Sequence, residues 1–300
     1  MSPQHGRPKE AAVPVGRAAR NAREQISSLG GTARSAKGAS MIRPLLSATG
    51  EAELATLATA RSLYAFDFDG TLAPIVASPD QARITAPMSR LLVALARQAP
   101  VAVISGRSRS DLRMRLPGDF FHIVGNHGNE SEAEFADELE QRRLVATWRR
   151  QLETLLSGAA SRGILIEDKG LSLSLHYRLA ADRDQARAAG NRAIEQLTPA
   201  PLVIGGKMVI NLLPQTARTK LEALQELATR EQARRVLFVG DDDTDELVFE
   251  RAPPEWITVR VAHWNGSRAR YFLHQQSNVT VLLDLLLRNL RLRARQAVKG

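Results

Sequence analysis

Runs of largely apolar residues alternate with segments of helical spacing from about residue 51 onward. Five such runs predict strands, at residues 63–66, 101–104, 121–124, 235–239 and 256–259. Continuous apolar runs indicate strands that are buried on both faces. Strands of this kind, separated by helices, are typical of a parallel sheet covered by helices on both sides. The pattern therefore predicts an α/β fold.

Three further segments predict helices around these strands. Residues 87–98 carry leucines on one side, residues 108–115 predict a short helix, and residues 278–294 predict a last helix. Leucine and valine at helical spacing favour a face that packs on a core. The inner face predicted for the last helix consists of Val281, Leu282, Leu285 and Leu286.

The middle of the chain has a different pattern. Residues 171–177 alternate strictly between apolar and polar, which indicates a half-exposed antiparallel strand, and a short turn at Lys169-Gly170 joins it to a strand at 164–168. Further strands are predicted at 202–204 and 208–212, and helices at 135–157 and 181–197. This block predicts a smaller α+β domain with an antiparallel sheet, inserted between the third and fourth strands of the parallel sheet.

The sequence divides into four predicted parts. These are a disordered basic arm at 1–50, a core domain at 51–130 and 213–290, the α+β insert at 131–212, and a basic tail at 291–300. The arm is rich in Gly, Ala, Ser, Pro and Arg with poor apolar periodicity, which favours a solvated tail over an organelle transit peptide.

Net charge first suggests a polyanionic partner, because the chain carries +9 at pH 7. The excess of Lys and Arg lies in the arm and after residue 287, whereas the body between them is slightly acidic. No specific nucleic-acid partner is therefore expected. The chain has 0 Cys, which excludes disulfides and thiolate chemistry. No apolar run approaches the roughly 20 residues that span a bilayer, so no membrane insertion is expected.

Polar residues follow directly after four of the predicted strands, where the carboxyl ends of parallel strands form ligand sites. They are Asp67 and Asp69, then Ser105 to Arg107, then residues 125–128, then 241–246. Asp67 could act as a nucleophile and Asp69 as an acid and base, although two Asp at this spacing also suit a turn or a cap. The acidic run at 241–246 suits a solvated loop or a hard cation with oxygen ligands, most simply Mg²⁺.

These residues resemble the motifs of the haloacid dehalogenase-like (HAD) superfamily. Residues 67–72 (DFDGTL) resemble its first motif, Ser105 its second, Lys220 its third and residues 240–242 (GDD) its fourth. The resemblance extends to the trehalose-6-phosphate phosphatase family through an ordered set of motifs. The set is DFDGTLAPI at 67–75, ISGR at 104–107, GNHGNE at 125–130, EDKG at 167–170 with HYR at 176–178, and GDDDTDE at 240–246.

The resemblance implies a Rossmann-like HAD core with the α+β insert as its cap, and Mg²⁺-dependent hydrolysis of trehalose 6-phosphate through an aspartyl phosphate. The implied catalytic residues are Asp67, Asp69, Ser105 and Lys220. The implied metal ligands are Asp67, the carbonyl of Asp69, Asp241 and Asp242, with Asp245 near the metal or its waters. The implied sugar-binding residues are Arg107, His127, Glu130 and Lys169. Lys169 also suits an exposed turn, and Glu130 a surface charge.

The sequence departs from the family pattern around the last cap strand. Asn211 stands where the family has Glu, Leu213 where it has a basic residue, and Leu221 where it has Gly. The departures leave open a related sugar phosphate as the substrate, and a non-catalytic binding module is a further alternative. The resemblance also implies a cytoplasmic enzyme of trehalose biosynthesis with a functional link to a trehalose-6-phosphate synthase.

Overall fold

The computed structural model describes residues 42–59, 61–76, 79–132, 137–158, 161–206 and 208–297. The predicted arm up to residue 41 therefore lies outside the described residues, as does the end of the predicted tail.

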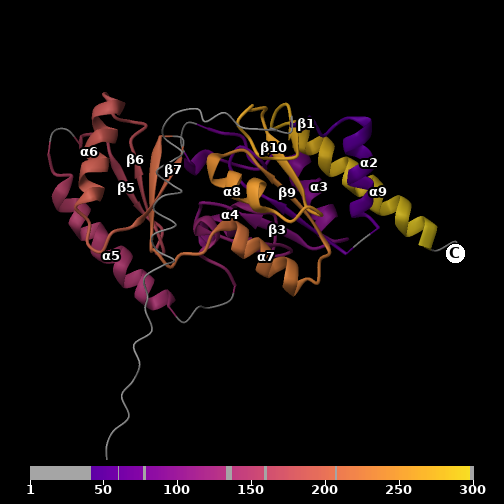
Figure 1. The fold of residues 1–300 in the computed structure, drawn as a ribbon, viewed down its shortest axis with the longest axis horizontal. Coiled ribbons are helices and arrows are strands. Elements are labelled where there is room, and N and C mark those ends of the chain that lie inside the picture. Colours follow the sequence, from indigo (N-terminus) through magenta and orange to yellow (C-terminus); the bar gives the residue numbers. More distant parts are fainter. Residues whose placement is uncertain are drawn as a thin grey trace, which may run out of the picture. The chain divides into compact units, whose positions relative to one another are not determined.

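A seven-stranded sheet, parallel at every pairing, lies at the centre of the larger of two sheet-containing parts of the described chain (Figure 1). The strand Arg43–Pro44 lies at one edge of the sheet and the strand His122–Val124 lies at the other. In spatial order the strands are β1 (Arg43–Pro44), β11 (Tyr271–Leu273), β10 (Ile257–Val261), β9 (Arg235–Gly240), β2 (Ser62–Phe66), β3 (Val101–Ile104) and β4 (His122–Val124). The central position of β2, between β9 and β3, brings its carboxyl end beside theirs.

Alternate residues of each central strand enter two different cores. Tyr64 and Phe66 of β2 pack in the core that contains α2 (Ala48–Leu57), α3 (Ala86–Ala96) and α9 (Asn278–Ala297). Leu63 and Ala65 pack on the other face, with α7 (Lys220–Arg230) and α8 (Glu246–Arg251). Burial on both faces explains why these strands are apolar throughout.

A separate four-stranded antiparallel sheet has the order β5 (Leu165–Asp168), β6 (Leu173–His176), β8 (Val209–Leu213), β7 (Leu202–Gly206). The helices α5 (Glu138–Leu155) and α6 (Arg183–Glu195) cover one face of it, where Trp148 and Leu152 pack on Leu173, Leu175 and Leu212 (Figure 1). The opposite face carries the polar positions of the alternating strands. The predicted fold class, a parallel α/β core with a smaller antiparallel α+β part, is confirmed.

Several predicted boundaries are wrong by a few residues. Ordered structure begins before residue 51, because Arg43 and Pro44 pair with β11 and α2 begins at Ala48. The helix α9 continues to Ala297, beyond the predicted end at residue 294, so residues 291–297 of the predicted basic tail are helical.

The inner face predicted for the last helix is half right. Leu282 and Leu286 are buried as predicted, together with Val279, Leu283 and Leu287, whereas Leu285 is only partly buried and Val281 is 46% exposed. The buried stripe is therefore rotated by part of a turn from the predicted one.

Five elements were not predicted: β1, α2, α7, α8 and β11. Among them, α7 had a clear signal, a capping box at Thr219 and Glu222 followed by leucines three apart at 221, 224 and 227. Among the described residues no helix has both the length and the apolar character needed to span a membrane.

Candidate active site

The carboxyl ends of three neighbouring strands bring polar side chains to one edge of the parallel sheet. Asp67 follows β2 and its backbone N–H donates to the carbonyl of Val239 in β9 at 2.8 Å. Ser105 follows β3, and Asp241 follows β9. All three are buried, with exposed fractions of 5%, 2% and 7%. The sheet order thus assembles the groups that the sequence predicted after separate strands.

Three carboxylates form a buried cluster at this edge. Oxygen atoms of Asp67, Asp241 and Asp245 lie within 4.8 Å of one another. Lys220, at the start of α7, donates from Nζ to Oδ1 of Asp67 and to Oδ1 of Asp245, both at 2.7 Å. One ammonium group therefore faces three carboxylates, and the cluster keeps an excess of negative charge.

The electrostatics of the cluster shift the pKa values of its members. Burial, together with Asp245 and Asp241, raises the pKa of Asp67 well above its ordinary value, and Lys220 opposes this. Burial opposes the charged form of Lys220, but the carboxylates of Asp245 and Asp67 outweigh it and raise the pKa of this ammonium. Lys220 thus stays charged. Carboxylate oxygens in such excess are the donor set of a hard divalent cation, so these residues fit a metal ion.

Local backbone geometry explains how the cluster packs so closely. Gly70 has φ +79°, and a Cβ there would lie 2.2 Å from Oδ2 of Asp241. Asp245 Oδ2 accepts from the backbone N–H groups of Asp241 and Asp242, each at 3.0 Å. Asp245 therefore holds the 241–245 turn in shape, while its other oxygen reaches Lys220. Asp242, also expected as a metal ligand, lines the same cavity but does not belong to the close cluster of Asp67, Asp241 and Asp245.

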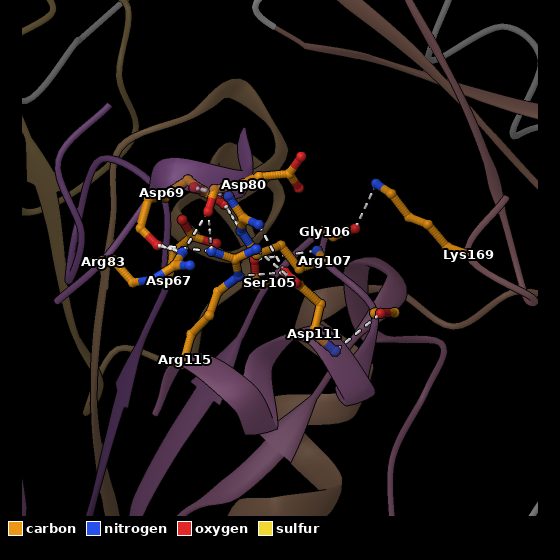
Figure 2. A network of polar contacts seen from close by, with 12 residues as sticks. Asp67, Asp69, Asp80, Arg83, Ser105, Gly106, Arg107, Asp111, Arg115 and Lys169 are labelled. Atoms are coloured by element: carbon orange, nitrogen blue, oxygen red, sulfur yellow. Dashed lines mark hydrogen bonds and ion pairs between the residues drawn. The ribbon is translucent and has the colours of Figure 1, made fainter. Parts of the chain in front are cut away.

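Asp69 lies beside the cluster and is bound by Arg107. The guanidinium donates from Nε to Oδ2 at 2.6 Å and from Nη2 to Oδ1 at 2.7 Å (Figure 2). Ser105 Oγ accepts from the backbone N–H of Arg107 at 3.3 Å, whereas Ser108 is the residue that caps the following helix, α4 (Arg109–Arg115). Ser105 is thus available to the site and does not cap α4.

The loop after β4 has a strained backbone that turns His127 into the site. Asn126 and His127 have φ values of +48° and +59°, and a Cβ on Gly128 would lie 2.3 Å from the carbonyl of Thr219. Neither ring nitrogen of His127 has a hydrogen-bond partner among the described residues. Burial, with Lys169 and Lys220 nearby, lowers the pKa of His127 well below its ordinary value. A neutral, unpartnered imidazole is suited to bind a ligand hydroxyl.

Glu130 has a different position from the one that a sugar-binding role suggests. Its Oε2 accepts from the backbone N–H of Arg109 at 2.8 Å and from Nδ2 of Asn126 at 2.7 Å. Glu130 does not line the cavity that contains the other predicted residues. Its contacts fix the loop that carries His127.

The antiparallel sheet contributes residues from the face that its helices leave uncovered. Lys169 Nζ donates to the carbonyl of Gly106 at 2.9 Å (Figure 2), and Glu167 contacts His176 Nε2 at 2.7 Å. Burial opposes ionisation of Glu167, but His176 and Lys169 lower its pKa. Asn211 accepts from Ser174 Oγ at 2.6 Å and donates to the carbonyl of Ile204 at 3.4 Å, so its amide is engaged within the sheet.

A cavity of about 490 Å³ unites these groups, a size that accommodates a small organic ligand. Nine of the ten predicted site residues line it, and the exception is Glu130. The residues concerned are Asp67, Asp69, Ser105, Arg107, His127, Lys169, Lys220, Asp241 and Asp242. Glu167 and His176, which the resemblance included only as motif positions, also line it. The signal for His176 is its polar position in the alternating strand at 171–177, whereas Glu167 follows an apolar run without alternation.

Comparison with known proteins agrees with this fold and site. The family model described as trehalose-phosphatase matches residues 65–277. A trehalose-phosphate phosphatase of Mycobacterium tuberculosis is 34% identical over 248 residues, which cover 75% of this chain and 61% of that protein. The chain thus spans about three fifths of the length of this curated relative.

Solved structures share the fold. The C-terminal domain of Candida albicans trehalose-6-phosphate phosphatase has a TM-score of 0.65 at 23% identity, over 83% of this chain and 99% of that one. Aspergillus fumigatus trehalose-6-phosphate phosphatase has a TM-score of 0.55 at 26% identity, over 82% and 99%. The fold is that of the HAD-like phosphatases. Within this class, the chain belongs to the trehalose-phosphatase family.

Proposed function

We propose that this protein is a Mg²⁺-dependent phosphatase that hydrolyses trehalose 6-phosphate to trehalose and phosphate. The observation that carries the proposal is the convergence of Asp67, Lys220 and Asp241 beside Asp69 in one cavity. Family membership supports the substrate. The matched curated relatives are longer than this chain, which spans about 61% of their length.

The proposed reaction has two steps. In the first, a carboxylate oxygen of Asp67 attacks phosphorus, the bond from phosphorus to the sugar oxygen breaks, and Asp69 gives a proton to that oxygen. In the second, water attacks the phosphorus of the aspartyl phosphate while Asp69 takes its proton, which releases phosphate and restores Asp67. Lys220 and Ser105 bind the phosphoryl oxygens and stabilise their charge.

The metal ligands in this proposal are Asp67, the carbonyl of Asp69 and Asp241, with Asp242 and Asp245 close to the ion or its waters. Held by these oxygen atoms, a divalent cation would neutralise charge on the transferring phosphoryl group. Mg²⁺ is favoured because every proposed ligand atom is oxygen.

The proposed sugar-binding residues are His127 and Lys169, with the antiparallel part as the cap over the sugar. The unpartnered nitrogens of His127 support this role. Exclusion of water by a cap protects the aspartyl phosphate and strengthens electrostatic contacts. A cytoplasmic location and supply of substrate by a trehalose-6-phosphate synthase belong to the same proposal.

A related sugar phosphate is the second candidate substrate, and Asn211 favours it. Asn211 stands where the family has Glu, so this side of the cavity offers the sugar no carboxylate at that position. The amide oxygen of Asn211 accepts from Ser174, and its amide nitrogen donates to the carbonyl of Ile204. A site built for hydroxyl groups discriminates strongly among sugars when one acceptor is changed.

The test is phosphate release from a panel of sugar phosphates, with Mg²⁺ and with EDTA. Trehalose 6-phosphate should have the highest kcat/KM, and EDTA should abolish the release. A clearly better substrate in the panel would replace trehalose 6-phosphate in the proposal. Asp67→Asn is the control for the nucleophile: unchanged release by this variant would exclude the mechanism, and no release by the wild type would favour a binding module.

A further inference from the structure

Three large apolar side chains that line the cavity are largely exposed. Ile75 is 53% exposed, Leu165 60% and Leu179 84%, and all three belong to the cavity lining. A single exposed leucine or isoleucine is normal on a protein surface. Several of them gathered at one cavity are instead typical of a ligand-binding groove.

Two of these side chains are neighbours at one edge of the antiparallel sheet. Leu165 lies in β5, where its Cα partner in β6 is His176, and Leu179 follows the end of β6. A Cβ on Gly163 would lie 2.6 Å from Cα of Ala180, so the residues just before β5 pack against those around Leu179. The sheet register and this close approach therefore bring Leu165 and Leu179 to the same side of the cavity.

Ile75 reaches the same region from the loop that follows β2 of the parallel sheet. Nη1 of Arg178 donates to the carbonyl of Val76 at 3.4 Å. This hydrogen bond joins the residue before Leu179 to the residue after Ile75. Val76 and Val209 also line the cavity, so both sheet-containing parts contribute apolar surface to it.

The apolar residues and the proposed phosphoryl-binding residues lie at different depths. Ser105 and Lys220 are 2% and 4% exposed, whereas each of the three apolar side chains is more than half exposed. A substrate whose phosphoryl group reaches Lys220 therefore has its most distant part near the open end of the cavity. The side chains that this part meets are those of Ile75, Leu165 and Leu179.

A sugar ring offers apolar surface as well as hydroxyl groups. The C–H groups of a pyranose lie on its two faces, and the hydroxyl groups extend from its rim. Burial of C–H surface against aliphatic side chains is favourable in proportion to the area removed from water. A charged group at the same place would lose hydration without a partner. The open end of the cavity therefore favours an uncharged sugar unit.

We propose that Ile75, Leu165 and Leu179 form an apolar subsite for the sugar unit furthest from the phosphate. The subsite selects phosphorylated disaccharides over monosaccharide phosphates, because only a disaccharide reaches it while its phosphoryl group lies at Lys220. This assignment rests on the proposed function and deepens it, since it adds specificity residues that make no hydrogen bond with their side chains.

The experiment compares wild type, Leu165→Ala and Leu179→Ala on trehalose 6-phosphate and on glucose 6-phosphate, which lacks the second ring. Each variant should lower kcat/KM on trehalose 6-phosphate about 5- to 20-fold, mainly through KM, because the lost contact is remote from the reacting atoms. On glucose 6-phosphate the change should stay below about twofold. If the wild type turns glucose 6-phosphate over too slowly, its inhibition constant against trehalose 6-phosphate supplies the same comparison.

The matched control is Leu139→Ala, which removes a leucine of similar exposure, 61%, from α5 and outside the cavity lining. It should behave as wild type on both substrates. Leu179→Met keeps the apolar volume and should stay within about twofold of wild type. Thermal unfolding checks the fold, and Leu179→Ala should unfold at the wild-type temperature because the side chain is so exposed.

An equal loss on both substrates overturns the inference, since it would mean that the apolar residues only hold the two sheet-containing parts together. An active wild type with unaffected Leu165→Ala and Leu179→Ala overturns the inference alone. A wild type that is inactive on every sugar phosphate overturns the proposed function and this inference with it.

Discussion

Gly70 and Asp241, 171 positions apart in the sequence, are in direct contact: a Cβ on Gly70 would lie 2.2 Å from Oδ2 of Asp241. The strands β2 and β9 are neighbours in the sheet, and the contact joins the loops that follow them. The glycine in the DFDGT motif is therefore required both by its φ of +79° and by the carboxylate packed on it.

Gly70→Ala should abolish phosphate release and weaken Mg²⁺ binding. The left-handed backbone costs about 1–2 kcal/mol for alanine, and the new Cβ displaces the carboxylate of Asp241. Thermal unfolding and a Mg²⁺ titration of activity measure the two effects. Gly158→Ala is the matched control, because a Cβ there meets nothing within 4 Å. Wild-type Mg²⁺ dependence in Gly70→Ala would mean that Asp241 is not a ligand.

Lys220→Met should destabilise the metal-free protein by about 3–5 kcal/mol at neutral pH, because it leaves buried carboxylates without their cation. Burial raises the pKa of Asp67, so protonation reduces the repulsion and the deficit should shrink as the pH falls. Mg²⁺ should raise the melting temperature of this variant more than that of the wild type. The phosphatase activity of this variant should be lost both with and without Mg²⁺.

The control for Lys220→Met is Arg230→Met on the same helix, whose ion pair with Glu132 is exposed. Such surface pairs contribute about 0–1 kcal/mol, so its stability should stay close to that of the wild type. If Mg²⁺ raised the melting temperatures of both variants equally, the proposed link between Lys220 and the carboxylate cluster would be contradicted.

The sequence predicts the site residues that directly follow a strand, but it does not predict the contacts that depend on how loops and turns fold. Asp67, Ser105 and Asp241 follow apolar strands directly, so the rule that ligands bind at the carboxyl ends of parallel strands places them together. The sequence places Asp245 near the metal or its waters. Its membership of the close cluster depends on the turn at 243–245, which directs one oxygen to Lys220 and the other to backbone N–H groups.

The same limit explains Glu130 and Arg107. Their residue types suit sugar hydroxyls, but the structure directs Glu130 to backbone and side-chain amides of its own loop region and Arg107 to two carboxylates. Such partner choice depends on which loops become neighbours, which apolar periodicity does not specify. The short elements were missed for a related reason: β1 has two residues and β11 three, too few for a periodic signal.

Glu130→Gln should reduce stability by about 1–2 kcal/mol, because an amide oxygen is a weaker acceptor for Arg109 N–H and Asn126 than a carboxylate. KM for trehalose 6-phosphate should change less than about threefold, since the side chain lies outside the cavity lining. Chemical denaturation and steady-state kinetics measure both. A large rise in KM at unchanged stability would restore the sugar-binding role predicted for Glu130.

Lys169→Met should raise KM about tenfold or more and affect kcat less. The ammonium lies in the cavity and its hydrogen bond to Gly106 connects the antiparallel sheet to the loop after β3. A charged hydrogen bond contributes about 1.5–3 kcal/mol, which corresponds to this change in binding. Arg150→Met, at an exposed position of α5, is the control for loss of one positive charge from the same part of the chain. Equal KM values in the two variants would show that Lys169 is only a turn residue.

His127→Asn should change how stability depends on pH. Burial lowers the pKa of His127 in the folded protein, so below the ordinary value of 6.5 the unfolded chain binds the proton more readily than the folded one. The neutral imidazole of His127 therefore makes its full contribution to the free energy of unfolding above pH 6.5. As the pH falls below that value, the wild type loses about 1.4 kcal/mol of this contribution per pH unit. Asparagine does not titrate and tolerates the left-handed backbone that His127 adopts, so the variant should lack this loss. Denaturant unfolding at pH 7.5 and pH 5.5 measures it, with the exposed His263→Asn as control. If His127→Asn and the wild type lose the same stability between these pH values, folding does not lower the pKa of His127, and the burial of a neutral imidazole proposed here is contradicted.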